Sequence, residues 1–136
     1  MLRLIITRAI NGILFGIMDA LLHANPFAQR LLSVYKPIAR TSVNAAAGIV
    51  IDLSYGFILG LLFLLLYKSL PGETGIVKGL SFAMIVWFLR VLMSVLSSWM
   101  MYTVPVSALV YVAAAGLVEM AVLGAIYGIF LHPFGN

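Results

Sequence analysis

The chain has 136 residues, of which 64% are hydrophobic and 9% charged, and its formal net charge is +4. A soluble domain of this size could not cover so large an apolar fraction with polar surface, so that class is excluded and lipid is the expected solvent. The absence of cysteine excludes disulfides and thiolate sites, and the small, dispersed positive charge favours loops near lipid headgroups over a nucleic-acid surface.

The length of the chain allows four membrane crossings, because roughly 20 apolar residues in a helix cross a hydrocarbon core of about 30 Å. We expect an all-α integral membrane four-helix bundle that forms one membrane domain over residues 1–136. The predicted spans, in chain order, are about 2–24, 42–67, 76–101 and 106–131. The charged start resembles that of a signal peptide, but no small-residue cleavage site follows, so we expect the first span to be retained.

The segment between the first two spans predicts a short interfacial helix at about 26–36. Asn25 and Pro26 are typical of a helix cap followed by proline at the first helical position. Beyond them, apolar side chains share one helical face and polar side chains the other, as in a helix lying in the membrane interface. We expect Pro37 to end this helix. Its basic face is a candidate site for lipid headgroups: Arg30, Lys36 and Arg40.

The second and fourth predicted spans resemble one another. A shift of 68 positions places Pro37 on Pro105 and the run Ala45–Gly48 on Ala113–Gly116, and nine of the 27 residues in 37–63 find an identical partner. A fainter likeness links the first and third spans. We therefore expect two tandem helix hairpins with the same membrane orientation. The alternative is that similar lipid surroundings selected similar helices.

Glycines recur at four-residue spacing in the first, second and fourth spans. Lipid provides no hydrophobic drive for helices to associate, so close backbone approach across small residues supplies dispersion contacts instead. The predicted helix-packing positions are Gly12, Gly16, Gly48, Gly56, Gly60, Gly116, Gly124 and Gly128. We expect these glycines to pack helices within one chain, and the alternative is a dedicated dimer face.

Four ionisable side chains lie inside the predicted spans: Asp19, Asp52, Arg90 and Glu119. Each costs at least about 2.5–3.5 kcal/mol near a helix centre, so such groups usually face the bundle interior and pair. A rise of 1.5 Å per residue places Asp52 and Arg90 roughly 15–17 Å from one membrane face, and Glu119 near about 20 Å. We therefore predict an intramembrane polar centre of Asp52, Arg90 and Glu119, extended by Ser94. Its two carboxylates around one guanidinium favour a proton on one carboxylate.

This centre has three interpretations. It could be a structural Arg–carboxylate pin that fixes helix packing, a proton-active or ligand-binding centre, or a contact with another subunit. Asp19 and His23, one helical turn apart, are a possible relay or ligand pair, because a carboxylate can orient an imidazole ring. His132 is expected at the opposite membrane face, so we predict no haem between the histidines. We also predict no catalytic residue, no metal and no other cofactor.

Basic residues are nearly balanced across the membrane. Arg3, Arg8, Lys68 and Lys78 fall on the side of the termini, whereas the basic face of the interfacial helix falls on the other side. The positive-inside rule places the side with more basic residues in the cytoplasm. The side of the termini has four basic residues and the other side has three, so we expect the termini to lie in the cytoplasm.

Several stretches resemble small four-span bacterial membrane proteins of unknown function. These stretches are Asp19–His23, Tyr35, Val77–Phe82, the apolar run after Pro105, Gly116–Glu119 and Leu123–Gly128. The resemblance implies a location in the bacterial inner membrane and brings no activity. Arg90 has no match in that pattern, so the predicted charge cluster depends on this sequence alone.

The leading functional prediction is a small membrane protein without enzymatic activity. Its short loops leave little soluble surface, so partners should dock within the membrane, either as a homo-oligomer or with the chain as an accessory or scaffolding subunit of a larger complex. One alternative is a proton- or ion-coupled transporter or channel-like protein that uses the Asp52–Arg90–Glu119 centre. Another is a lipid- or quinone-binding module that uses the basic face.

Overall fold

The computed structural model describes residues 1–131, which are almost entirely helical and contain no strand. Its elements are α1 (Leu2–His23), α2 (Pro26–Leu31), the 3₁₀ helix η1 (Leu32–Ile38), α3 (Ala45–Leu66), α4 (Gly75–Val86), the π-helix η2 (Trp87–Leu92), α5 (Met93–Met101) and α6 (Val106–Phe130). Within this part of the chain, four stretches are long and apolar enough to cross a membrane: Leu4–His23, Ala45–Leu66, Gly75–Met101 and Val106–Phe130. The predicted all-α bundle of four spans is confirmed, and these stretches indicate a multi-pass membrane protein.

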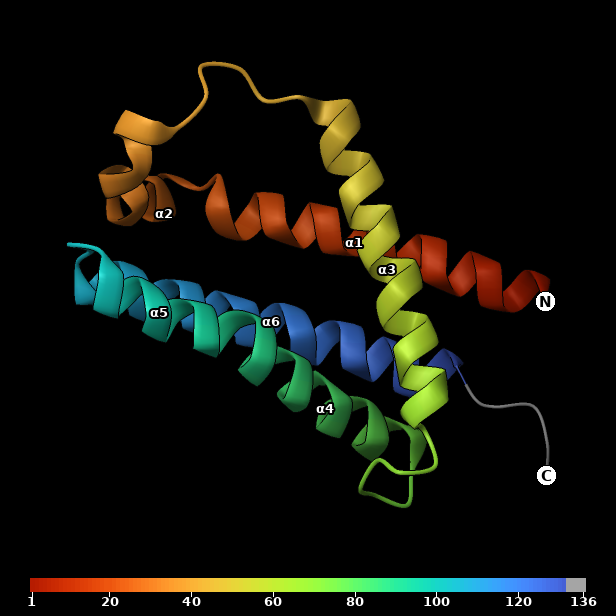
Figure 1. Ribbon diagram of the computed structural model, residues 1–136. Helices are drawn as coiled ribbons and strands as arrows, with labels where there is room; N and C mark the ends of the chain where they lie inside the picture. Colours follow the sequence, from red (N-terminus) through yellow and green to blue (C-terminus); the bar gives the residue numbers. More distant parts are fainter. Residues whose placement is uncertain (132–136) are drawn as a thin grey trace.

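The helices form two pairs, in which α1 packs against α3 and α4 packs against α6. Contacts between α1 and α6 join the pairs. In Figure 1, α1, α4, α5 and α6 run roughly along one direction, whereas α3 crosses α1 steeply and its first half points away from the other helices. The N-terminus and the turn after α3 lie at one end of the bundle, and α2 lies at the other.

Side-chain caps determine where three of the helices begin. Each cap accepts a hydrogen bond from the backbone N–H three residues further on: Asn25 for α2, Asn44 for α3 and Thr74 for α4. The first N–H groups of a helix have no partner within the helix, so such caps favour the start at that residue. Helix α3 therefore begins at Ala45.

The predicted short helix between the first and second spans is present, but it continues through Pro37 to Ile38. Its second half, η1, has 3₁₀ geometry. Pro37 lacks an N–H, which costs a single hydrogen bond in a helix that ends one residue later. The expectation that Pro37 ends the helix was therefore wrong by one residue.

The third span is not a uniform α-helix, because residues 87–92 form the π-helical turn η2. A π-turn inserts extra backbone and rotates the side chains that follow relative to an α-helical register. Trp87 lies at its start, and its Nε1 donates a 2.8 Å hydrogen bond to the carbonyl oxygen of Ala113 in α6. The sequence contains no signal that predicted this turn.

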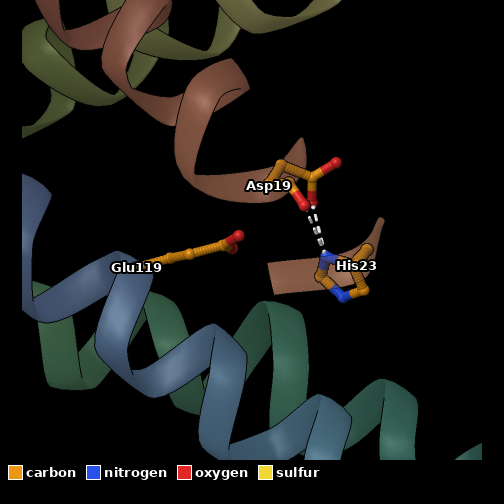
Figure 2. Close-up of side chains that lie close together, drawn as sticks. All are labelled: Asp19, His23 and Glu119. Atoms are coloured by element: carbon orange, nitrogen blue, oxygen red, sulfur yellow. Dashed lines mark hydrogen bonds and ion pairs between the residues drawn. The ribbon is translucent and has the colours of Figure 1, made fainter. Parts of the chain in front are cut away.

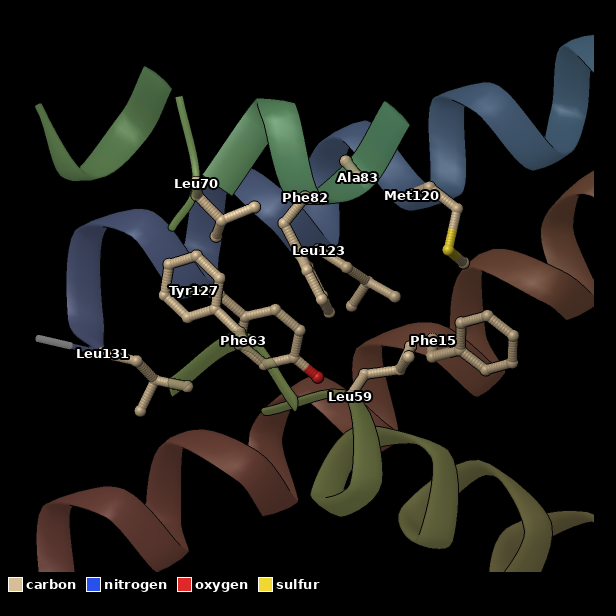
Figure 3. Packing of buried hydrophobic residues seen from close by; sticks show 10 residues of the cluster. All are labelled: Phe15, Leu59, Phe63, Leu70, Phe82, Ala83, Met120, Leu123, Tyr127 and Leu131. Carbon is tan, nitrogen blue, oxygen red and sulfur yellow. The ribbon is translucent and has the colours of Figure 1, made fainter. Parts of the chain in front are cut away.

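An aromatic cluster joins α3 to the α4–α6 pair (Figure 3). Phe63 is fully buried, and its ring centroid lies 5.5 Å from those of Tyr67 and Phe82 and 5.9 Å from that of Tyr127. The Tyr127 hydroxyl donates a 2.8 Å hydrogen bond to the carbonyl oxygen of Gly56. The cluster therefore supplies both dispersion contacts and a hydrogen bond between the two helix pairs.

Glycines lie where the helices of each pair cross. A Cβ atom added to Gly56 would lie 2.6 Å from the backbone nitrogen of Gly12, and one added to Gly79 would overlap the carbonyl oxygen of Gly124. Gly79 is not in the predicted packing set. The other glycines of that set divide as follows: Gly16 abuts Asp52, Gly60 abuts Arg8, Gly116 abuts Val91, Gly128 abuts Gly75, and Gly48 has no such neighbour within 4 Å.

Candidate functional site: a polar pocket inside the bundle

A cavity of about 290 Å³ lies between α1, α6 and the third span. Its lining combines charged and polar side chains with small and apolar ones: Asp19, His23, Arg90, Val91, Ser94, Val112, Gly116 and Glu119. All of these residues belong to the candidate membrane spans. Ionisable side chains inside a membrane span are energetically costly and usually mark a functional site, so this cavity is the candidate functional site.

Asp19 and His23 contact one another on the last turns of α1, and they form an ion pair when His23 is protonated. The Nδ1 atom of His23 lies 3.1 Å from Asp19 Oδ1 and 3.1 Å from the Asp19 backbone oxygen (Figure 2). The ring of Tyr111 meets the His23 ring edge-on, with centroids 6.5 Å apart. These contacts orient the imidazole. Asp19 and His23 are four residues apart, so they lie on the same face of the helix, as the sequence predicted.

Glu119 enters the pocket from α6. Its side chain is 3% exposed, and its Oε1 has no hydrogen-bond partner among the described residues. Figure 2 shows it extending from α6 toward the Asp19–His23 pair. One ligand-type atom from each of these three residues lies within 4.8 Å of the others. The structure therefore brings together an imidazole and two carboxylates from two helices.

Arg90 lines the same cavity but is held by aromatic side chains. Its Nε donates a 3.2 Å hydrogen bond to the Tyr55 hydroxyl, and its guanidinium carbon lies 4.6 Å from the Tyr55 ring centroid and 5.1 Å from that of Phe15. Such cation–π contacts stabilise a guanidinium in an apolar setting. Within residues 1–131, Arg90 makes no ion pair with Asp52 or Glu119.

The predicted Arg90–carboxylate contacts therefore do not form in the described part of the chain. Counting residues from the end of a span gives the depth of a side chain in the membrane. It does not give the direction in which that side chain points from its helix. Arg90 also lies within the π-turn, where an α-helical register does not apply. Ser94 lines the cavity beside Arg90, whereas Asp52 lies elsewhere.

Asp52 lines a second cavity, of about 570 Å³, between α1 and the first half of α3. Its carboxylate abuts Gly16 of α1, and most other lining residues are apolar or small. The intramembrane residues predicted to be functional thus lie in two different cavities. Asp19 and His23 share one cavity with Arg90, Ser94 and Glu119, whereas Asp52 lines the other.

The basic face of the short helix lies on the surface of the molecule. Arg30 and Lys36 line a depression of about 340 Å³ together with Gln29. Arg40 follows η1 and is exposed. A role for these residues at lipid headgroups stays a prediction. His132, the other histidine, lies outside the described residues.

The approach of Glu119 to Asp19 could not be predicted from depth counting. That count puts Asp19 near one end of α1 and Glu119 deep in α6. In the structure, Tyr111 in the second turn of α6 contacts Leu22 at the end of α1, through a short hydrogen bond from its hydroxyl to the Leu22 carbonyl. Helix α6 therefore begins beyond the end of α1, and this axial offset moves Glu119 toward Asp19.

Comparison with known proteins gives one result for this chain. A family model described as "Family of unknown function (DUF6789)" matches residues 5–134. Neither a curated protein nor a solved structure matches the chain. The match covers nearly the whole sequence and supplies no activity or ligand.

Proposed function

The chain belongs to the family of unknown function DUF6789, and from its geometry we propose a non-enzymatic protein of the bacterial inner membrane that associates with a second copy of itself within the bilayer. The observation that supports this proposal is a small-residue surface on α3 without a partner helix. The competing function is an accessory role, in which another membrane protein covers this surface.

The small-residue run Ala45–Gly48 opens α3 and is left largely uncovered by the other described helices. Its alanines are exposed, and a Cβ atom added to Gly48 would meet nothing within 4 Å. The matching run, Ala113–Gly116 in α6, is covered at its end: Ala115 is 5% exposed and Gly116 abuts Val91 of η2, whereas Ala114 is exposed. The same sequence motif is therefore packed in one helix pair and open in the other.

Equivalent crossings support the proposal that the two pairs are tandem duplicates. Gly56 and Gly124 are related by the 68-residue shift, and Gly12 and Gly79 by a shift of 67. Each pair crosses at these glycines. In the second pair, a helix of the chain covers the small-residue run. By analogy, a helix from a second copy would cover the open run Ala45–Gly48.

The carboxylate of Asp52 supports the same proposal. It lies in the groove beside this run, and none of the described residues gives it a hydrogen bond or ion pair. An ionisable side chain inside a span costs several kcal/mol unless it is shielded or paired. A second copy seated on the groove would shield Asp52 from lipid.

The substitution Gly48→Leu tests this association. Because nothing lies within 4 Å of the added Cβ, the single chain can accommodate the side chain, whereas a helix seated in the groove cannot approach. We expect the dimer to weaken by at least about tenfold, the equivalent of one close helix contact. Native mass spectrometry in mild detergent, over a range of protein concentrations, measures the dimer fraction.

Ala114→Leu is the matched control, because Ala114 is an exposed small residue in the equivalent run of α6. It should leave the dimer fraction unchanged. A wild-type chain that stays monomeric at every concentration, or a Gly48→Leu dimer of wild-type strength, would contradict self-association. Co-purification of a different membrane protein in fixed ratio, lost in Gly48→Leu, would instead assign the groove to an accessory role.

A further inference from the structure

We propose that Asp19, His23 and Glu119 form a binding site for one divalent transition-metal ion, such as Zn²⁺, inside the membrane. This site lies between α1 and α6, apart from the groove on α3, and does not depend on self-association. The spacing of these residues in the sequence predicted no metal here.

The donor set suits such an ion. A neutral imidazole with two carboxylates is typical of zinc, manganese and non-haem iron sites, whereas magnesium and calcium prefer oxygen ligands alone. Three protein ligands with an open position beside a cavity also leave room for water. Here the cavity of about 290 Å³ adjoins all three residues.

Glu119 provides an independent indication that a ligand belongs here. Its side chain is 97% buried, and Oε1 has no hydrogen-bond partner in the described part of the chain. A buried carboxylate without a partner is strongly unfavourable, and coordination to a cation is one of the few arrangements that compensate it. The carboxylate extends toward the Asp19–His23 pair (Figure 2).

The distances need little adjustment. Ligand atoms about 2.1 Å from a tetrahedral ion lie about 3.4 Å from each other. His23 Nδ1 and Asp19 Oδ1 are already 3.1 Å apart, and all three ligand-type atoms lie within 4.8 Å. The largest separation must shorten by at most about 1.4 Å, the difference between 4.8 Å and the tetrahedral spacing of about 3.4 Å. The metal would take the place of the proton shared between Nδ1 and the Asp19 carboxylate.

The charges around the site also favour a cation. Arg90 is the arginine that lines this pocket beside His23, and its hydrogen bond goes to Tyr55 and not to a carboxylate. When His23 is neutral, as a metal ligand must be, ionised Asp19 and Glu119 outnumber Arg90 and leave a net negative charge. The Ser94 hydroxyl lies in the same lining, where it can accept a hydrogen bond from metal-bound water.

Metal binding to the full chain in mild detergent tests the proposal, after removal of any histidine tag and treatment with a chelator. Calorimetric titration with Zn²⁺ measures affinity and stoichiometry, and the absorption spectrum of added Co²⁺ reports the ligand geometry. We expect one ion per chain. Glu119→Gln and His23→Gln should each weaken binding by at least about tenfold.

Asp52→Asn is the matched control, because it removes a carboxylate within a span that lies outside this pocket. It should bind Zn²⁺ like the wild type. Absence of saturable binding at one ion per chain, or unchanged affinity in both ligand variants, would overturn the proposal. If Glu119→Gln does not yield monodisperse protein, His23→Gln decides, because that side chain is partly exposed.

Discussion

Replacement of Phe63 by alanine is expected to destabilise the bundle by about 3 kcal/mol, the low end of the cost of such a truncation in a soluble core. Phe63 is fully buried, and three aromatic rings surround it. Moving an apolar side chain from lipid into the protein interior contributes little free energy, because both surroundings are apolar. The destabilisation therefore comes mainly from the dispersion contacts that are lost when the truncation leaves a cavity. The cluster also holds α3 against the second helix pair, so its loss should loosen that junction.

Reversible unfolding in mixed micelles, followed by helical circular dichroism, measures this change. Leu65→Ala is the control on the same helix, because Leu65 is 71% exposed and faces lipid. Its effect should stay within about 0.5 kcal/mol. Equal destabilisation by the two substitutions would show that the aromatic cluster is not the contact that joins the pairs.

Gly79→Ala is expected to destabilise the α4–α6 pair by about 1–3 kcal/mol, the usual cost of overpacking. The added methyl group would overlap the carbonyl oxygen of Gly124 and lie 3.0 Å from the backbone nitrogen of Gly128. Both obstacles are backbone atoms within a helix, so neither can rotate away. The two helices must separate, which weakens every contact along the crossing.

Thermal unfolding of the monomer in detergent provides the measurement, and Gly48→Ala provides the control. The same methyl group at Gly48 meets no atom within 4 Å, and alanine is the better helix former. Gly48→Ala should therefore keep or raise the unfolding temperature, whereas Gly79→Ala should lower it. A similar fall for both variants would contradict the close crossing of α4 and α6.

Helix α1 contributes to both proposed sites. Its glycines, Gly12 and Gly16, face α3 and Asp52, whereas Asp19 and His23 face the pocket beside α6. The glycine pair and the Asp19–His23 pair therefore lie on different faces of α1 and contact different helices. A variant on one face should leave the property of the other face intact, which makes the two proposals separable by experiment.

The predicted polar centre illustrates where sequence reasoning reaches its limit. The four charges of the prediction lie inside spans of the structure, as Arg8 and Lys78 also do, because a charge within an apolar run is visible locally. Their partners were not predicted, since Arg90 is held by Tyr55 and Phe15, and neither ring carries a signal of that role in the sequence.

What the sequence by itself determined is the solvent, the number of spans and the short helix between the first two. These follow from local properties: runs of apolar residues, capping side chains and prolines. Only the tertiary structure decided which side chains share a pocket. The axial offset of α6 against α1, the steep crossing of α3 and the π-turn at residues 87–92 set those neighbours. Each depends on contacts between residues far apart in the chain, which hydropathy and spacing do not record.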